Sequence, residues 1–498
     1  MPVKSYRILT VSLALGALAA CQHVAPLRNE AGRGEAGHVT PSCPGDATRS
    51  ETILTLEKGP VEYTACAGTI RVTDTRDAPL ADLFYTAYML PSDKDEPRPI
   101  AFVWNGGPGA DSRLLHFRAL GPKTLQAGQL ADNTDSPLPA ADLVFLDPAG
   151  TGFSRASSDE AARTLYSTTG DIAATAQFIR RFLAAQGRTA SPLYLVGESF
   201  GTWRASGVAE ALLQVGQPVA GIALISGGIP MGEERDRALM RALTLPNRTA
   251  TALALGKLDT SLSADPAGAL ASSELWARDV WYPALAAPQS LTFRQRQEVV
   301  TGLARFMGLA PSRIDSATLW VSPRDFRQGL LADEGKTLGI FDMRRTQAEE
   351  GDSGADAVLA YYRRALGFRD GKYAGIEVPA LPVGRDWQYD QAPITKESLA
   401  RAMAGEGPPS PSQPWVLRAL EMSPTMRVLV ATGLYDSLNG CAANREAANR
   451  FPAPLAKQID THCYRGGHMM YEDSAEAVQF ADDLKSFFTN ADDARKLE

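Results

Sequence analysis

The stretch LYLVGESFGTWR, residues 193–204, joins an apolar run to an amphipathic one through a short turn that holds Glu198 and Ser199. Its first four residues are long enough for a buried strand, and residues 202–214 have the apolar spacing of a helix. Two glycines flank the serine in a G-x-S-x-G pattern, which places a serine hydroxyl on a tight turn between strand and helix. The stretch therefore predicts that Ser199 is a nucleophile. A glycine-rich turn with an incidental serine is the alternative.

Short apolar runs alternate with helical patterns on both sides of this stretch. Five runs are each long enough for a fully buried strand: 100–104, 142–147, 193–196, 221–226 and 427–432. Upstream, three segments rich in β-branched and aromatic residues predict antiparallel strands: 52–56, 61–74 and 80–90. The chain is therefore predicted to have an α/β fold with a mostly parallel central sheet and N-terminal antiparallel strands.

The regular alternation stops between residues 229 and 425. This stretch holds helix-like segments, several aromatic residues and joints rich in Gly and Pro. Because a strand pattern resumes at residue 426, we interpret residues 229–425 as a largely helical cap inserted into a core of residues 51–228 and 426–498. A separate second domain is the alternative.

The amino terminus has the features of a secretion signal. Two basic residues precede an apolar stretch that is too short to span a bilayer, so residues 1–20 are predicted to be a signal peptide. The residues that end at Cys21 resemble the bacterial lipobox, which implies a lipid anchor on Cys21 and a place in the bacterial cell envelope. The following segment is rich in Gly, Pro, Ser and charge, so residues 21–50 are predicted to be a flexible tether. Gln22 favours the outer membrane, with the protein facing the periplasm or the exterior. An ordinary signal peptide cut at a small-residue site is the alternative.

Composition places the chain among ordinary globular proteins. Of its 498 residues, 44% are hydrophobic and 21% are charged, and the net charge is -7 at pH 7. The chain lacks the basic stripe that nucleic-acid binding requires, so a nucleic-acid partner is not expected. It also lacks metal-ligand spacing and a phosphate-binding glycine loop, and therefore neither a metal nor an organic cofactor is predicted.

Four cysteines remain after Cys21. An even number of cysteines in an exported chain predicts two disulfides. We pair Cys43 with Cys66 and Cys441 with Cys463, although four cysteines permit three pairings.

A nucleophilic serine needs a base that takes its proton and an acid that orients the base. Among the five histidines, His468 follows a pair of glycines in a loop near the carboxyl end, whereas His462 lies inside the run AKQIDTHCY at 456–464 and is expected to pack. Asp436 comes just after the strand predicted at 427–432, where a sheet presents its functional loops. The sequence therefore predicts a triad of Ser199, Asp436 and His468. An aspartate on a surface loop is the alternative for the acid.

A glycine-rich loop, NGGPG, follows the strand predicted at 100–104. Acyl transfer needs N–H donors aimed at the developing oxyanion. One such donor comes from a loop in this position and the other from the residue after the nucleophile. The amides of Gly107 and Phe200 are therefore predicted to form an oxyanion hole, and a simple turn is the alternative.

These motifs together resemble those of the serine carboxypeptidase family, in the family's order, over roughly residues 95–490. The resemblance implies an α/β-hydrolase fold and removal of single residues from the carboxyl end of peptides through an acyl-enzyme on Ser199. It also implies that Asn105, Gly106 and Glu198 bind the substrate, whose partner group is a free terminal carboxylate. The motifs that carry it are WNGGPG at 104–109, LDPAGTGFS at 146–154, GESFG at 197–201, the Asp436 loop and GGHM at 466–469.

The resemblance raises a question about Glu198. Two carboxylates about 4 Å apart repel by ~4 kcal/mol at an effective dielectric near 20, so Glu198 and a substrate carboxylate would have to share a proton. Many family members have a second glutamate where this chain has Ala119, and its loss weakens such a clamp. The competing hypothesis is a fixed cation, supplied by Arg113, Arg118 or Arg204.

Two other functions remain open at this point. One is an esterase or acyltransferase on the same scaffold, which would turn over peptide acids and their amides alike. The other is a binding protein that retains the fold without catalysis, which a fluorophosphonate would not label at Ser199.

Overall fold

A computed structural model of the chain describes residues 38–56, 58–93, 97–232, 236–346, 354–389, 396 and 412–489. The predicted signal peptide, Cys21 and the first part of the predicted tether, up to residue 37, lie outside the described residues. Within the described ranges, no helix combines the length and the apolar character that a membrane span needs.

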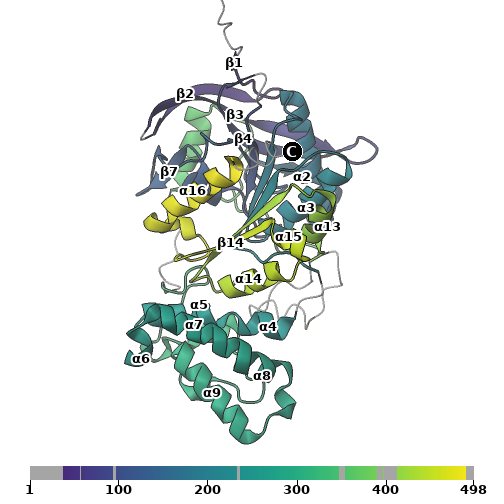
Figure 1. The fold of residues 1–498 in the computed structure, drawn as a ribbon. Coiled ribbons are helices and arrows are strands. Elements are labelled where there is room, and N and C mark those ends of the chain that lie inside the picture. Colours follow the sequence, from purple (N-terminus) through teal and green to yellow (C-terminus); the bar gives the residue numbers. More distant parts are fainter. Residues whose placement is uncertain are drawn as a thin grey trace, which may run out of the picture. The chain divides into compact units, whose positions relative to one another are not determined.

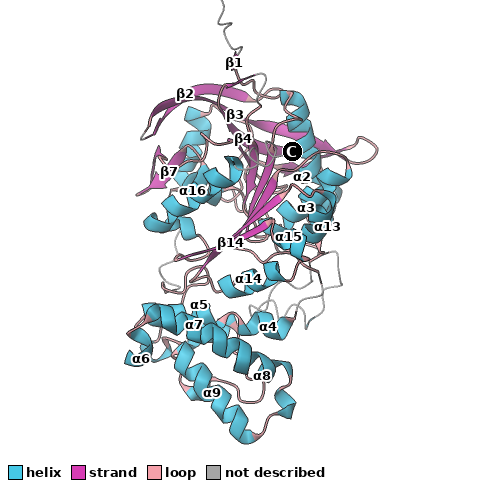
Figure 2. Cartoon of the chain, in the orientation of Figure 1, coloured by secondary structure: helices cyan, strands magenta, loops and turns pink. Residues whose placement is uncertain are grey.

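A ten-stranded sheet organises the described part of the chain (Figure 1 and Figure 2). Its order is β14-β13-β12-β11-β6-β9-β4-β3-β2, and β10 pairs with β4 outside this path. The strands from β14 to β9 run parallel, whereas β4, β3 and β2 pair antiparallel. The predicted combination of a parallel centre and antiparallel N-terminal strands is therefore confirmed. The strands are β2 (Thr48–Leu56), β3 (Gly59–Thr73), β4 (Pro79–Met89), β6 (Ile100–Trp104), β9 (Asp142–Leu146), β10 (Arg155–Ala156), β11 (Leu193–Glu198), β12 (Gly221–Ile225), β13 (Arg427–Gly433) and β14 (Ile459–Tyr464).

Two short strand pairs lie outside this sheet. They are β1 (His38–Val39) with β5 (Ser92–Asp93), and β7 (Lys123–Gln126) with β8 (Gln129–Asp132).

Helices cover both faces of the sheet (Figure 1). One face packs against α2, α3 and α13 in a core that includes Phe102, Phe178 and Val208. The other face packs against α16 and the segment around Tyr362. The central strands β6, β9 and β12 are buried at every position, and their residues are apolar except for Asp142, because both faces of the sheet are covered. The helices of this part are α1 (Asp159–Leu165), α2 (Thr168–Gln186), α3 (Gly201–Gln214), α13 (Trp415–Met422), α14 (Cys441–Asn449), α15 (Ala453–Ala456) and α16 (Ser474–Thr489), with the short turns η1 (Leu115–Leu120) and η8 (Met470–Glu472).

The chain between β12 and β13 forms two parts. We call residues 237–343 the helical lobe; its hydrophobic cluster, which includes Trp281 and Phe326, is drawn from residues 242–343 among those that the structure describes. The elements of the lobe are α4 (Arg237–Ala242), α5 (Leu245–Ala254), α6 (Thr260–Ser263), α7 (Pro266–Trp276), η2 (Ala277–Trp281), α8 (Tyr282–Ala286), η3 (Pro288–Ser290), α9 (Phe293–Met307), η4 (Pro311–Arg313), α10 (Pro323–Gly329) and η5 (Ala332–Glu334).

The second part returns to the sheet. It contains α11 (Ala355–Ala360) and η7 (Tyr361–Ala365), and the ring of Tyr362 lies 5.5 Å from that of Phe84 on β4. Further along, α13 packs against α3, so the last residues before β13 belong to the core around the sheet. The helical interruption expected at 229–425 is present in the described residues, but its final part packs with the sheet. The division of the chain into a core and a cap stays a prediction.

Two disulfides cross-link the described residues. Cys43 is joined to Cys66 on β3, and Cys441, the first residue of α14, is joined to Cys463 on β14. Both predicted pairings are confirmed.

Replacing Cys441 and Cys463 by serine is expected to lower the free energy of unfolding by about 3 kcal/mol, because the cross-link restricts the unfolded chain. Denaturant unfolding at equilibrium measures the loss. The Cys43 and Cys66 pair is a matched control, since the two sequence separations are 22 and 23 residues and the expected losses are similar. An unchanged unfolding midpoint in both double variants contradicts the prediction.

Candidate active site

Ser199 lies on the turn between β11 and α3, where the G-x-S-x-G pattern places it. Its φ of 58° is in the left-handed region, which residues other than glycine rarely adopt. The Ser199 amide donates to the carbonyl of Ile225 at 2.8 Å, which ties the turn to the end of β12. A Cβ atom at Gly197 would lie 2.0 Å from the carbonyl oxygen of Gly201, so this turn closes only with glycine there. The half-buried serine therefore sits at the carboxyl ends of the parallel strands.

Asp436 and His468 form a buried hydrogen-bonded pair. His468 Nδ1 lies 2.8 Å from Asp436 Oδ2, and the two side chains are 2% and 0% exposed. A carboxylate can only accept, so Nδ1 carries the proton and Nε2 is left as an acceptor. The amide of Leu438 and the side-chain amide of Asn439 also donate to Asp436, at 2.8 and 3.1 Å. The acid is thus oriented to hold the imidazole in the tautomer that a general base needs.

The turn that carries Ser199, which we call the elbow, and the loop that carries His468, which we call the histidine loop, meet at the end of β12. The Ser226 hydroxyl donates to the carbonyl of His468, while the preceding residue, Ile225, accepts from the amide of Ser199. The side chain of Asn439, which also holds Asp436, donates to the Ser226 carbonyl at 2.8 Å. The three residues predicted as a triad follow β11, β13 and β14, and these contacts at the end of β12 bring them into one neighbourhood.

His462 takes no part in this arrangement. It lies on β14, partly exposed, and its Nδ1 is 2.9 Å from Asp483 Oδ2 on α16. It therefore belongs to a second Asp–His pair, which lies on the edge strand.

Burial and charge act in opposite directions on His468. Burial alone lowers the pKa of the imidazole, but the Asp436 carboxylate, by its charge and its hydrogen bond, and the Glu198 carboxylate raise it, and the net pKa lies above the ordinary value. The imidazole therefore retains its proton to a higher pH than a free histidine does.

Glu198 is held by two donors. Asn105 Nδ2 donates to Oε1 at 2.8 Å, and the Tyr471 hydroxyl donates to Oε2 at 2.5 Å. Glu198 and Asn105 are 3% and 1% exposed, so both predicted substrate-binding side chains are buried and contact each other. Burial raises the pKa of Glu198; His468, Tyr471 and Asn105 oppose the rise, Glu472 adds to it, and the net shift is upward.

The glycine loop lies directly against the elbow. A Cβ atom at Gly106 would be 2.5 Å from the amide nitrogen of Phe200, so only glycine permits this approach. Among the described residues, the amides of Gly107 and Phe200 have no backbone partner. These two N–H groups are therefore available in the region where the sequence predicts an oxyanion hole.

Arg204 holds the glycine loop from below. Its Nη1 donates to the Asn105 carbonyl at 2.9 Å, and its Nε donates to Asp171 Oδ2 at 2.6 Å. The guanidinium is 1% exposed. The hypothesis that Arg204 meets a substrate carboxylate is therefore wrong, because the side chain is enclosed between α2, α3 and the loop.

Asp147 is a further support for the loop. The amide and the hydroxyl of Ser112 both donate to Asp147 Oδ1 at 2.9 Å. Burial, with the charge of Asp111 adding to it, raises the pKa of Asp147 to about 7. The sequence motif at 146–154 contains this residue, but its position there does not reveal that it fixes the segment after the glycine loop.

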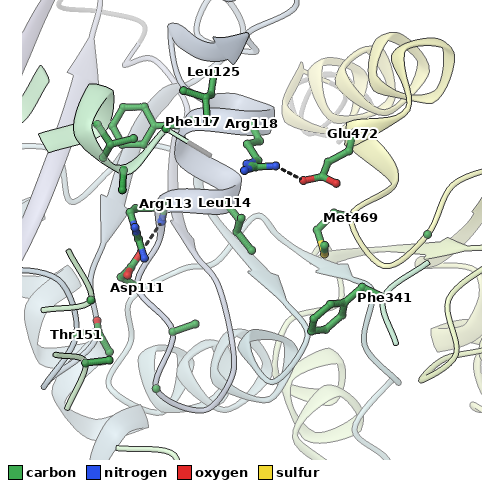
Figure 3. A pocket seen from close by; sticks show the side chains of 18 of the residues that line it. Asp111, Arg113, Leu114, Phe117, Arg118, Leu125, Thr151, Phe341, Met469 and Glu472 are labelled. Atoms are coloured by element: carbon green, nitrogen blue, oxygen red, sulfur yellow. Dashed lines mark hydrogen bonds and ion pairs between the residues drawn. The ribbon is translucent and has the colours of Figure 1, made fainter. Parts of the chain in front are cut away.

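A cavity of about 520 Å³ opens beside the histidine loop (Figure 3). Gly467 and Met469, on either side of His468, line it, and so does Phe341, whose ring lies 5.3 Å from the imidazole. Ser199 and Glu198 are not among the described residues of its wall. The apolar part of the wall includes Leu114, Phe117, Leu125, Val358 and Leu381, and the charged part Asp111, Arg113, Arg118, Asp342, Arg344, Arg345, Glu472 and Asp473.

Two of the three arginines that the sequence suggests as carboxylate partners line this cavity. Arg118 Nη1 donates to Glu472 Oε1 at 2.6 Å, and Arg113 Nε donates to Asp111 Oδ1 at 2.8 Å. Figure 3 shows the Arg113–Asp111 pair on the left of the cavity and the Arg118–Glu472 pair on the right. The cavity thus adjoins the buried Asp436–His468 pair and offers both apolar and charged contacts to a substrate.

Comparison with known proteins finds one family and one fold. Residues 57–217, which include the glycine loop and the elbow, match the model of the serine carboxypeptidases. No curated protein matches the chain in sequence.

Solved structures similar to this chain include three hydrolytic enzymes. Kex1(delta)p, a prohormone-processing carboxypeptidase from Saccharomyces cerevisiae, has a TM-score of 0.52 and 14% identity, and the match covers 86% of this chain and 91% of that chain. Proline iminopeptidase from Mycobacterium smegmatis has a TM-score of 0.35 and 13% identity, and the match covers 86% of this chain and 99% of that chain. The haloalkane dehalogenase DbeA-M1 loop variant from Bradyrhizobium elkanii has a TM-score of 0.38 and 14% identity, and the match covers 87% of this chain and 99% of that chain. The chain has an α/β-hydrolase fold, as predicted.

Proposed function

We propose that this hydrolase removes residues from the carboxyl end of peptides through an acyl-enzyme on Ser199, because residues 57–217 match the model of the serine carboxypeptidases. The observation that carries the proposal is the buried hydrogen bond between Asp436 and His468 beside the elbow of Ser199. The cavity next to His468 supports it, since a leaving residue needs a compartment on that side of the nucleophile.

The first half of the reaction forms the acyl-enzyme. Ser199 Oγ attacks the carbonyl carbon of the last peptide bond, and its proton passes to Nε2 of His468. Asp436 stabilises the imidazolium that results. The carbonyl oxygen becomes an oxyanion, which the amides of Gly107 and Phe200 bind. As the C–N bond breaks, His468 returns the proton to the leaving amine, and the terminal amino acid departs.

The second half releases the shortened peptide. Water enters where the amine left, His468 takes its proton, and the resulting oxyanion occupies the same two amides. Collapse of this intermediate breaks the bond to Ser199 Oγ, which regains its proton from His468. The residues of the site complete this cycle without a net change in their own protonation.

We also propose that the protein works outside the cytoplasm. Its two disulfides support this proposal, because such bonds persist in oxidising compartments. The proposal includes the signal peptide at 1–20 and a lipid anchor on Cys21 in the cell envelope.

The function is tested by turnover of N-blocked dipeptides with a free terminal carboxylate, compared with the corresponding amides. A carboxypeptidase prefers the free acids strongly. Equal turnover of acids and amides contradicts the proposal and favours an esterase or acyltransferase.

The pH dependence of hydrolysis is expected to show the raised pKa of His468. The base must be neutral to act, so kcat/KM falls as the pH drops through this pKa, beginning above the ordinary histidine value of about 6.5. Glu198→Gln removes one of the two charges that raise it, so the acidic limb of the profile moves to lower pH. The profile of p-nitrophenyl acetate hydrolysis measures the shift without a peptide carboxylate.

Glu210→Gln is the control for this experiment. Glu210 pairs with Arg418 on α13, away from His468. Removal of its charge should therefore leave the acidic limb of the pH profile at the wild-type pH. An acidic limb that stays at the wild-type pH, or moves to higher pH, in Glu198→Gln contradicts the prediction.

A further inference from the structure

We propose that Tyr471 is a positioning residue that acts through Glu198, and that its hydroxyl controls recognition of the terminal carboxylate of the peptide. The inference rests on the proposed function and on the carboxylate subsite that the family resemblance implies at Asn105 and Glu198. The motifs that carry the resemblance do not include Tyr471.

Tyr471 reaches Glu198 from the segment that follows the base. It lies on η8, three residues after His468, and its hydroxyl donates to Glu198 Oε2 at 2.5 Å. Glu198 is the last residue of β11 and directly precedes Ser199. The hydrogen bond therefore joins the segment that carries the base to the segment that carries the nucleophile, through the side chain that is implied to bind the substrate.

The ring of Tyr471 is held by its surroundings. The residue is 3% exposed, and its ring lies 6.0 Å from that of Phe480 on α16. The turn η8 also packs against η1, the turn that carries Ala119, and both turns contribute to the same apolar cluster. A ring that is packed on these sides gives its hydroxyl a fixed position. The donor to Glu198 is therefore in place before a substrate binds.

Two side chains donate to Glu198 in the described part of the chain, those of Asn105 and Tyr471. Ala119, which stands where many family members have a second glutamate, has no polar side-chain atom to offer. A phenolic hydroxyl differs from a second carboxyl group in one respect, because as a neutral donor it favours the charged form of the carboxylate that accepts from it. Tyr471 thus opposes protonation of Glu198.

Glu198 can keep both of these donors while it binds a substrate. A carboxylate has about four lone-pair sites on its two oxygens, and Asn105 and Tyr471 each occupy a site on a different oxygen. A further site remains for the proton that Glu198 and a terminal carboxylate must share if two negative charges are not to meet. Recognition through Glu198 therefore weakens as the pH rises and the free enzyme loses this proton.

The groups that face Glu198 determine the pH at which it ionises. Burial raises the pKa of Glu198, the charge of His468 and the hydrogen bonds from Tyr471 and Asn105 lower it, and the charge of Glu472 raises it. Two guanidiniums pair with Glu472 in turn, those of Arg118 and Arg345. Removal of the Tyr471 hydroxyl takes away one of the two hydrogen bonds and leaves these charges in place. The pKa of Glu198 should therefore rise, and recognition should extend to higher pH.

The test follows the preference for a free carboxylate as a function of pH in wild type and in Tyr471→Phe. An N-blocked dipeptide acid is compared with its amide. Both substrates need neutral His468, so the ratio of their kcat/KM values cancels its titration. In the wild type the ratio should fall about 10-fold per pH unit above the pKa of Glu198. In Tyr471→Phe the fall should begin about 1 to 2 pH units higher, because a hydrogen bond to the charged form is lost.

Tyr464→Phe is the matched control. The Tyr464 hydroxyl donates to Asp483 Oδ2 at 2.7 Å, so this variant removes the same kind of hydrogen bond on the edge strand. It should leave the fall of the ratio at the wild-type pH and change each kcat/KM less than about 3-fold. If Tyr464→Phe moves the fall as far as Tyr471→Phe does, the effect is not specific to Glu198 and the inference is wrong.

A double-mutant cycle tests whether Tyr471 acts through Glu198. Glu198→Gln cannot ionise, so its ratio of acid to amide should not depend on pH above about pH 5, where the substrate carboxyl group is ionised. Adding Tyr471→Phe to Glu198→Gln should leave this ratio within about 3-fold at each pH. A pH-dependent change in the double variant as large as that in Tyr471→Phe means that the hydroxyl acts on another group, and it overturns the inference.

The remaining outcomes distinguish this inference from the function on which it rests. A wild-type enzyme that shows no preference for the acid at any pH overturns the proposed function itself. A wild-type preference that is independent of pH means that a fixed cation binds the carboxylate, which overturns the inference and leaves the carboxypeptidase proposal intact. The same is true if the ratio falls at one pH in both wild type and Tyr471→Phe.

Discussion

Replacing Ser199 by alanine is expected to lower kcat for peptide hydrolysis about 10⁶-fold. The variant retains the oxyanion donors and the cavity but has no oxygen on which an acyl-enzyme can form. Because alanine also tolerates the left-handed backbone poorly, the free energy of unfolding should be measured beside the kinetics. Labelling by a fluorophosphonate should disappear together with the activity.

Ser206→Ala provides the matched control. Ser206 lies on α3, seven residues after the elbow, and its hydroxyl donates to the Thr202 carbonyl within that helix. Its loss should leave both labelling and kcat within about 3-fold of wild type, since the variant removes one local hydrogen bond. Substantial residual turnover or labelling in Ser199→Ala would mean that another residue is the nucleophile.

Asp436→Asn is expected to lower kcat about 10⁴-fold near neutral pH. An asparagine can donate its side-chain N–H to His468 Nδ1, which stabilises the tautomer with its proton on Nε2. The imidazole then faces Ser199 with a donor and cannot take the hydroxyl proton. The size of the isosteric side chain is unchanged, so the buried loop should keep its packing. Pre-steady-state measurement of acylation separates this defect from slow release of product.

The second Asp–His pair offers a control of the same chemistry. His462 Nδ1 lies 2.9 Å from Asp483 Oδ2 on the edge strand, and Asp483 also accepts from the Tyr464 hydroxyl. Asp483→Asn should therefore affect stability by about 1 kcal/mol and leave kcat nearly unchanged. If both aspartate variants lose activity equally, His468 is not the base.

The sequence predicts the central strands well because burial on both faces leaves a continuous apolar run. The runs at 100–104 and 221–226 correspond to β6 (Ile100–Trp104) and β12 (Gly221–Ile225). The elbow can be predicted equally well from the sequence, because the close approach at Gly197 and the positive φ of Ser199 restrict which residues fit there. Asp436 and His468 could be selected by position because parallel strands bring their carboxyl ends to one edge of the sheet.

Contacts between distant polar residues could not be predicted in this way. Nothing periodic in the sequence indicates that Tyr471 donates to Glu198, or that Arg204 joins Asp171 to the carbonyl of Asn105. Each contact depends on one rotamer of a side chain brought near by the whole fold. For the same reason Arg204 was indistinguishable from Arg118 in the sequence, although one is enclosed and the other lines the cavity.

The helical lobe has its own hydrophobic cluster, with Trp281 and Leu303 fully buried inside it. The lobe also contacts both catalytic loops: the Phe341 carbonyl accepts from the His468 amide, and the Asn247 side chain donates to the carbonyls of Gly433 and Asn439. Evolution could therefore change the interior of this cluster, and with it the peptide preference, as long as Phe341 and Asn247 keep their contacts with these loops. A lobe grafted from a relative would accordingly have to reproduce these two contacts if the graft is to alter selectivity without loss of the catalytic geometry.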